Sequence, residues 1–376
     1  MHIIQEMNIM KKPAALLAHL TALSIFAVVG IMLTGCGPSG DPAQRSTNGS
    51  VPSFSLAWSE YPSWSTFGVA HELKIIDGAA GKLGPVEEKW GVDIVLKEAD
   101  YDTCIVMYGA GQCDAACLTN MDSLAPGLTR PAVGILPTST SDGADACIVT
   151  DNIKQVQDLK GKKIYGLAKT VSEYTFVRNL DLLGEREANY QFTNMDPGAA
   201  AVAMQQKQSG YEAIVVWNPF VLETLNKRDD VKVLFDSTQI PGEIIDMVVM
   251  AADSLAKPKG DAFACAVIEA FYEVNRRIAD PATSDDTLVA LGEKFSHLEL
   301  DSMKKVVEQT KFYSTAKQGL ALYEGQEIQT TMQQVVKFCV DHEIIEKAAG
   351  VAYGSGSEQA ALRFDPTYMK RVSTRN

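Results

Sequence analysis

The sequence predicts an α/β protein, because short apolar runs of strand length alternate with amphipathic helical segments through most of the chain. From Asp261 to Ala349 the pattern becomes almost wholly helical. The 341 residues that follow residue 35 of this 376-residue chain are enough for two α/β lobes of ordinary size. No internal repeat or low-complexity block follows residue 50.

The predicted strands are short runs rich in Val, Ile and Leu, bounded by turn residues. They are 54–58, 92–99, 114–119, 132–138, 146–150, the end of 156–167, 210–220, 231–236 and 244–252. Helices are expected over 69–81, over 171–184, where Gly184 caps the end, and over 262–278.

The N-terminal residues have the pattern of an export signal. Lys11 and Lys12 precede an apolar stretch over 14–33. The stretch is about as long as a membrane span, so a retained anchor is the alternative. The motif Leu33-Thr34-Gly35-Cys36 resembles a bacterial lipobox, which ends in a lipid-modified cysteine, and it decides against the anchor.

We therefore expect residues 1–35 to be a lipoprotein signal peptide and Cys36 to carry the lipid. Residues 36–51 contain little but Gly, Pro, Ser, Thr, Asn and Asp and predict a flexible tether. Each buried methylene of a lipid chain contributes about 0.8 kcal/mol, so two or three chains hold a protein on a membrane. The expected location is the periplasm or cell surface.

The chain is acidic, with 34 Lys and Arg against 47 Asp and Glu and a formal net charge of −13 at pH 7. Nucleic-acid binding needs clustered Lys and Arg to neutralise phosphates, and the sequence has no such cluster. We therefore expect no nucleic-acid partner. Most of the acidic side chains are expected to be solvated surface, so they do not identify a ligand.

Six cysteines follow Cys36 at positions 104, 113, 117, 147, 265 and 339. An exported location permits disulfides, and an even number is compatible with them. Most of the six stand in apolar runs, where cysteine behaves as a small buried hydrophobe. Buried thiols are therefore favoured over a disulfide framework. The Cys and His spacings do not suit zinc, and we expect no metal.

Three stretches resemble, in their order, the NitT/TauT-type periplasmic solute-binding proteins of ABC transporters. The first is SLAWSEYPSWSTFGVAHELKII at 55–76, a strand, a loop and a helix of small residues. The second is GAGQCDAACLTNMDSLAPGL at 109–128. The third is the pair VQDLKGKKIYGLAKTVSEYTFVRNLDLLG at 156–184 and GYEAIVVWNPFVLETL at 210–225. The unusually aromatic first loop and the extra cysteines depart from the family pattern.

This resemblance implies a two-lobed periplasmic-binding-protein fold of type II, with two crossing strands and a helical C-terminal part. Lobe one would comprise 52–142 plus 247–376, and lobe two 143–246. The crossings would lie near Ser141–Cys147 and Ile245–Ala251. The ligand would lie in the cleft between the lobes, and closure would be a hinge motion.

Candidate ligand-binding residues lie in the loops after the predicted strands, because ligands of open α/β sheets bind outside the carboxyl ends of strands. The candidates are Trp58, Glu60, Tyr61, Trp64, Asn120, Asp122, Ser139, Ser172, Trp217 and Asp246. Other roles remain open for several of them. Trp58 also suits the core, Glu60 a solvated loop, Asp122 a helix N-cap, Ser172 a cap, and Asp246 a hinge or surface position.

Aromatic faces combined with carboxylates suit a small polar or cationic nitrogenous solute, through cation–π attraction and charge-assisted hydrogen bonds. An anion would call for Arg or Lys in these loops, and Arg130 and Lys169 are the only nearby candidates. The composition therefore favours a guanidinium-, amine- or urea-like solute. A receptor for an anion such as nitrate or a sulfonate is the alternative.

We expect a monomeric binding protein rather than an enzyme, with no cofactor, whose partners are the solute, an ABC permease and ATPase, and a membrane reached through the lipid on Cys36. Only His71, His297 and His342 lie beyond the predicted signal, and none stands in a triad-like arrangement. The sequence has no Gly-x-Ser-x-Gly elbow and no P-loop. Some proteins of this fold are pyrimidine-forming enzymes that use histidine and iron, and a sensor or adaptor is a further alternative.

Overall fold

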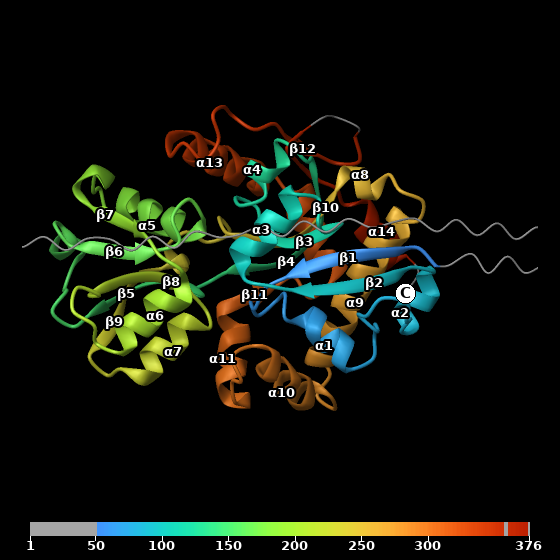
Figure 1. Cartoon of the computed structure of the whole chain (residues 1–376), viewed down its shortest axis with the longest axis horizontal. Coiled ribbons are helices and arrows are strands. Elements are labelled where there is room, and N and C mark those ends of the chain that lie inside the picture. The colour runs from blue at the N-terminus through green and yellow to red at the C-terminus, as the bar shows by residue number, and fades with distance from the viewer. Residues whose placement is uncertain (1–50, 357–359, 375–376) are drawn as a thin grey trace, which may run out of the picture. The chain divides into compact units, whose positions relative to one another are not determined.

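The computed structural model describes residues 51–356 and 360–374, which belong to one unit spanning Ser50–Asn376. Two separate β-sheets, each flanked by helices, organise this unit (Figure 1). We call the part built on the larger sheet lobe one and the part built on the smaller sheet lobe two. The predicted α/β class is confirmed. The predicted signal peptide, Cys36 and nearly all of the tether lie outside the described residues.

The sheet of lobe one has the strand order β12-β13-β4-β10-β3-β1-β2, and β11 pairs with β4. Its strands are β1 (Ser53–Trp58), β2 (Asp93–Glu98), β3 (Ala115–Thr119), β4 (Ala132–Ser141), β10 (Ile245–Ala251), β11 (Thr310–Phe312), β12 (Val351–Tyr353) and β13 (Leu362–Phe364). All residues of β3, β4 and β10 are buried; β3 and β10 are largely apolar, whereas β4 ends in the buried polar run 138–141.

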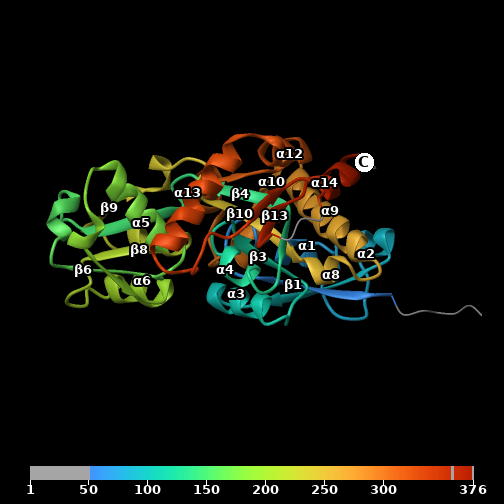
Figure 2. The ribbon, with the colours of Figure 1, turned by 90° about the horizontal axis from the view of Figure 1, so that it is seen from above.

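The helices of lobe one include a long C-terminal series, as the pattern after Asp261 predicts. They are α1 (Thr66–Glu72), α2 (Pro85–Trp90), α3 (Tyr101–Gly109), α4 (Leu124–Gly127), α8 (Ala252–Leu255), α9 (Gly260–Ala279), α10 (Ser284–Lys294), α11 (Leu300–Gln309), α12 (Ala316–Glu324), α13 (Glu327–Asp341) and α14 (Thr367–Ser373). Figure 2 shows α9 and α14 running beside each other, and α9 buries most of its length. Among the described residues, no helix is both long enough and apolar enough to cross a bilayer.

The sheet of lobe two has the order β7-β6-β8-β5-β9. Its strands are β5 (Asp145–Thr150), β6 (Lys163–Gly166), β7 (Gln191–Asn194), β8 (Ala213–Trp217) and β9 (Val231–Asp236), and its helices are α5 (Val171–Leu182), α6 (Pro197–Gln205) and α7 (Phe220–Lys227). Two links join the lobes: residues 142–144 between β4 and β5, and residues 237–244 between β9 and β10. The return link therefore precedes Ile245–Ala251, which is the central strand β10 of lobe one.

Two expectations about local structure are wrong, and two short strands were not predicted. The helix expected over 69–81 ends at Glu72, because Lys74 and Gly78 have positive φ angles of 57° and 73° that no α-helix accommodates. The strand expected over 210–220 is limited to Ala213–Trp217, since Gly210 has a φ of 90° and α7 begins after Pro219. The short strands β12 and β13, beyond the helical series, were not expected.

Candidate functional site

Strand direction brings the termini of four lobe-one strands, β1, β3, β4 and β10, to the same end of the sheet. Parallel pairing places the carboxyl ends of β1 and β3 together, after Trp58 and Thr119. Antiparallel pairing places Asp246, near the start of β10, opposite Thr119 on one side and Ser139 on the other. The loops in which the sequence placed candidate ligand-binding residues therefore meet at one end of this sheet.

One end of the lobe-two sheet lies in the same region. Asp145 opens β5 and pairs with Trp217, the last residue of the antiparallel strand β8. β6 runs parallel to β8, so its carboxyl end lies at this same end of the sheet. The segment that follows β6 leads there into Val171, the first residue of α5. The two links between the lobes start or end here as well.

A small pocket lies between these ends of the two sheets, and we call it the inner pocket. Its cavity volume is about 10 Å³, and it is lined by Tyr61, Trp64, Tyr101, Thr119, Asp145, Val171, Trp217, Ile244 and Asp246. Lobe one supplies Tyr61, Trp64, Tyr101, Thr119 and Asp246, and lobe two supplies Asp145, Val171 and Trp217. The lining therefore consists largely of four aromatic rings and two carboxyl groups.

The four rings form a continuous aromatic wall. Tyr61 and Trp64 have ring centroids 4.9 Å apart, and Trp64 stacks on Tyr101 at 5.4 Å with an interplanar angle of 18°. Tyr101 then meets Trp217 of lobe two edge to face at 5.7 Å. Such walls attract cations through the negative faces of the rings.

Burial raises the pKa values of both carboxyl groups in the inner pocket. The pKa of Asp145 rises to about 7, because burial disfavours its charge and Asp122 adds repulsion. Burial also holds the pKa of Asp246 well above its usual range, although Ser139 donates a 2.6 Å hydrogen bond to it. A cation placed between these groups would favour their charged forms.

One polar group of the aromatic wall lacks a partner. The Trp64 indole N–H is buried and makes no hydrogen bond within the described part of the chain, whereas the Tyr61 hydroxyl interacts with Asp246. Buried polar groups in native proteins are rarely left unpaired, so the Trp64 N–H is available to a ligand.

An outer pocket adjoins the inner one and shares Tyr101 and Trp217 with it. Its carboxylates come from Glu60, Glu98, Asp100, Asp102 and Asp196. The Glu60 carboxylate accepts hydrogen bonds from the backbone N–H and the hydroxyl of Ser296, which fix it at the rim. Glu60 therefore belongs to the outer pocket and not to the inner one.

The structure separates the ten candidates by position. Tyr61, Trp64, Trp217 and Asp246 line the inner pocket. The Ser139 hydroxyl does not line it but donates a hydrogen bond to the Asp246 carboxyl group. Asp122 lies immediately beyond the lining, where it binds Tyr101 and Thr119. It does not cap α4, because Ser123 is the N-cap residue of that helix. Trp58, Asn120 and Ser172 do not line either pocket.

Trp58 and Ser172 are buried in the protein interior. The Trp58 ring lies against Gly68, where an added Cβ would come within 3.0 Å of it. Trp58 is therefore a core residue of lobe one, the alternative that the sequence left open. Ser172 is 1% exposed in the first turn of α5, and its hydroxyl has no partner among the described residues.

Asn120 connects the loop after β3 to the return link. Its amide nitrogen donates to the Glu243 carbonyl at 3.0 Å, and its amide oxygen accepts from the Ile245 N–H at 3.1 Å. Its role is thus to fix the link that carries Asp246 into the pocket.

Replacing Asn120 with alanine is expected to destabilise the fold by about 1–3 kcal/mol, because the buried Ile245 N–H loses its acceptor and the half-buried Glu243 carbonyl loses a donor. Denaturant unfolding monitored by circular dichroism measures this loss. A change below about 0.5 kcal/mol would contradict the role assigned to Asn120.

The sequence did not identify Tyr101, Asp145, Thr119, Val171 or Ile244 as site residues. Tyr101 opens α3 directly after β2, and Asp145 opens β5 directly after a three-residue link. Both positions adjoin strand ends, so strand boundaries contained a usable signal. The pairing of Asp145 with Trp217 depends on strand register, which the sequence pattern did not show.

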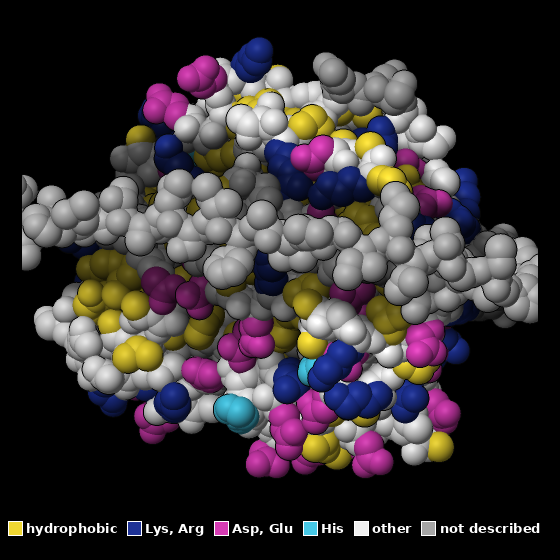
Figure 3. Space-filling model, turned by 45° about the vertical axis from the view of Figure 1, so that its right-hand side comes forward, with side chains coloured by type: hydrophobic (Ala, Val, Ile, Leu, Met, Phe, Trp, Pro, Cys, Tyr) yellow, Lys and Arg dark blue, Asp and Glu magenta, His cyan; other side chains and the backbone are white. Residues whose placement is uncertain are grey.

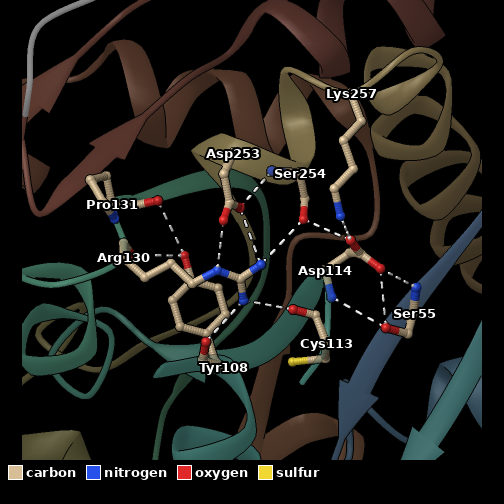
Figure 4. Close-up of polar contacts among 9 residues, drawn as sticks. All are labelled: Ser55, Tyr108, Cys113, Asp114, Arg130, Pro131, Asp253, Ser254 and Lys257. Carbon is tan, nitrogen blue, oxygen red and sulfur yellow. Dashed lines mark hydrogen bonds and ion pairs between the residues drawn. The ribbon is translucent and has the colours of Figure 1, made fainter. Parts of the chain in front are cut away.

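The basic side chains nearest to the predicted loops are engaged elsewhere. Figure 4 shows Arg130 held by the carbonyls of Tyr108 and Cys113 at 2.9 and 2.7 Å and by Asp253. Lys169 donates to the Glu343 carbonyl at 3.2 Å. Arg178 forms a bidentate pair with Glu243, with both distances 2.9 Å. Among the described residues, no Lys or Arg lines the inner or the outer pocket.

The described residues contain no group of three or more His, Cys, Asp or Glu arranged to hold a metal ion. The six cysteines are all buried, and burial raises the pKa of Cys104 to about 12 and of Cys113 to about 11. Basic and acidic side chains are interspersed over the face that Figure 3 shows.

Comparisons with known proteins identify the fold. No protein-family model matches the chain. No curated protein matches it by sequence. Among solved structures, the periplasmic aliphatic sulphonate binding protein SsuA from Escherichia coli is similar, with a TM-score of 0.62 and 17% identity over 79% of this chain and 94% of that one.

Two further structures agree. The alkanesulfonate-binding protein SsuA from Xanthomonas axonopodis pv. citri, bound to MOPS, has a TM-score of 0.60 and 12% identity over 83% of this chain and 98% of that one. The CA3427 gene product of Candida albicans, described as having the generic periplasmic binding protein fold, has a TM-score of 0.58 and 13% identity over 79% and 92%. The chain therefore has the periplasmic-binding-protein fold.

Proposed function

We propose that this protein is the extracytoplasmic solute-binding component of an ABC importer of the NitT/TauT type and that it is not an enzyme. It binds a small cationic or polar nitrogenous solute, such as a guanidinium, amine or urea-like compound, between its lobes. The observation that carries the proposal is the inner pocket, in which four aromatic rings and two buried carboxyl groups face each other without a basic residue in the described lining.

The energetics of the pocket support a cation. Burying a charged carboxylate away from water without a positive charge beside it is costly. The pKa values of Asp145 and Asp246 are therefore raised. A positively charged nitrogen would bind both carboxylates through charge-assisted hydrogen bonds and contact the faces of Trp64 and Trp217. The cavity itself measures about 10 Å³, room for about one water molecule, so a solute would enter the inner pocket only when the lobes part.

A receptor for sulfonates is the second candidate, because two of the similar structures are sulfonate-binding proteins and one was solved with MOPS. This candidate requires hydrogen-bond donors in place of carboxylates. The Trp64 indole N–H is an unpartnered donor in the inner pocket, within the described part of the chain.

A thermal-shift screen separates the two candidates. The chain from Ser39 onward keeps the whole unit Ser50–Asn376 and is tested with guanidinium, urea, amines, amino acids, nitrate, sulfonates and pyrimidines. A ligand that binds only the folded state adds about 2.7 kcal/mol of stability at 100 times its Kd. We expect shifts with nitrogenous cations. Shifts with anions alone would contradict the proposed ligand class.

We also propose that the protein is a monomer anchored by lipid on Cys36 and that its two lobes close by a hinge at the two links, residues 142–144 and 237–244. Mass spectrometry of the membrane-extracted protein tests the anchor. A peptide beginning with diacylated Cys36 is expected, and an unmodified cysteine or a retained residue 1–35 segment would contradict it.

A further inference from the structure

The outer pocket is far larger than the inner pocket that it adjoins. Its cavity measures about 540 Å³, whereas the cavity of the inner pocket measures about 10 Å³. Lobe one lines the outer pocket with segments at the carboxyl ends of β1 and β2, and lobe two with segments at the carboxyl ends of β6, β7 and β8. Because Tyr101 and Trp217 line both pockets, one elongated solute would contact both of them.

The outer pocket carries negative charge that no basic side chain neutralises. None of its five carboxylates forms an ion pair with a described Lys or Arg. Glu60, Asp102 and Asp196 each accept a hydrogen bond from a backbone N–H. The side chains of Glu98 and Asp100 are exposed and make no hydrogen bond within the described part of the chain. These two carboxylates are therefore free to bind a cation.

A buried hydroxyl in the lining of the outer pocket indicates a ligand independently of the carboxylates. Ser59 is 5% exposed, and its hydroxyl makes no hydrogen bond with any described residue. Buried polar groups are rarely left unpaired, and a hydroxyl oxygen accepts a hydrogen bond from an ammonium group. The rings of Trp217 and Phe220 meet edge to face at 6.3 Å in the same lining, and aromatic faces attract cations.

We propose that the solute is an elongated diamine or polyamine whose second positively charged nitrogen binds in the outer pocket. Its first nitrogen binds in the inner pocket, and its methylene chain lies against Tyr101 and Trp217. The second nitrogen binds the carboxylates of Glu98 and Asp100 and the hydroxyl of Ser59. This inference rests on the proposed function, because it requires that the inner pocket binds a cation.

Two amines of equal chain length test the contribution of the second charge. Putrescine has an amino group at each end, and pentylamine has a methyl group in place of one of them. The full chain in detergent is titrated calorimetrically with putrescine, pentylamine and guanidinium chloride at pH 8, where both amines are protonated. We expect putrescine to bind at least about tenfold more tightly than pentylamine, because only putrescine gains the charge-assisted hydrogen bonds of the outer pocket.

The double variant Glu98→Gln/Asp100→Asn tests whether the outer pocket supplies this gain. It is expected to lower the ratio of putrescine affinity to pentylamine affinity at least about threefold. The matched control is Asp229→Asn/Asp286→Asn, which removes the same amount of negative charge from exposed positions outside both pockets. Its affinity ratio is expected to equal that of the wild type. Circular dichroism establishes that both double variants are folded.

A wild-type protein that binds guanidinium or pentylamine but gains less than about tenfold from the second amino group would overturn the inference alone. A control that lowers the affinity ratio as much as the outer-pocket variant would also overturn it, because the gain would then come from the overall charge of the protein. Binding of none of the three cations would overturn the proposed ligand class and the inference together. The guanidinium and pentylamine titrations therefore distinguish the two failures.

Discussion

Replacing Asp145 or Asp246 with asparagine is expected to weaken the binding of a cationic solute by about 100-fold or more. Each residue places a carboxyl group in the inner pocket, one from each lobe. Removing one partner of a buried, hydrogen-bonded charge pair costs about 2–5 kcal/mol, and about 2.7 kcal/mol corresponds to 100-fold. Isothermal titration calorimetry with the tightest cation of the screen measures the change.

Two features make this test specific. Asparagine has nearly the same shape as aspartate, so the fold and the aromatic wall are expected to persist. Asp286→Asn, at an exposed carboxylate on α10, is the matched control, and its affinity is expected to equal that of the wild type. Cation affinities of Asp145→Asn and Asp246→Asn within threefold of the wild type would show that these carboxyl groups do not bind the solute.

The unliganded protein is expected to lose stability from Asp145 as the pH rises, which is the reverse of the usual behaviour of an aspartate. The folded-state pKa of about 7 lies above the ordinary value of 3.8. Between these values the folded state holds a proton that the unfolded state has released, so stability falls as the pH rises through this window. The span of about 3 pKa units corresponds to about 4 kcal/mol.

The difference between Asp145→Asn and the wild type isolates this contribution from all other titrating groups. Urea unfolding at pH 4 is expected to show similar free energies, and at pH 7.5 the variant is expected to be more stable by up to about 4 kcal/mol. Equal free energies at pH 7.5, or a variant that is less stable there, would contradict the buried, uncompensated carboxyl group.

Cation binding is expected to show the opposite pH dependence, because the solute binds the ionised form. Burial raises the pKa of Asp145 to about 7 and holds the pKa of Asp246 well above its usual range. Below about pH 7, each proton that must leave weakens binding by up to about tenfold per pH unit. Titration at pH 5, 6, 7 and 8 is expected to give the tightest binding at pH 8. A Kd that is constant over this range would contradict this linkage.

The fold followed closely from the sequence because its strands are short, apolar and bounded by turn residues. The regions around β2 and β10 illustrate this, since their observed bounds differ by one residue at each end from the predicted ones. Local backbone geometry was harder to predict. The positive φ angle of Lys74 ends α1 early, and nothing in the side chain of a lysine signals that conformation.

The candidate site was only partly predictable. Tyr61, Trp64, Trp217 and Asp246 follow or open strands and were found on that basis. Asp145 was not predicted as a site residue, because its position opposite Trp217 depends on the antiparallel register of two strands far apart in the chain. The contact of Tyr101 with Trp217 likewise depends on how one lobe meets the other. Relations between lobes arise from tertiary structure, and periodicity within a segment does not encode them.

The most direct test of the central claim is a crystal structure of the protein with the tightest cation of the screen. We predict that the solute lies in the inner pocket, with nitrogen atoms about 2.7–3.2 Å from the carboxyl oxygens of Asp145 and Asp246. Its charged group would lie against the faces of Trp64 and Trp217. A solute bound away from the inner pocket, or one held there without contact to either carboxyl group, would contradict the account.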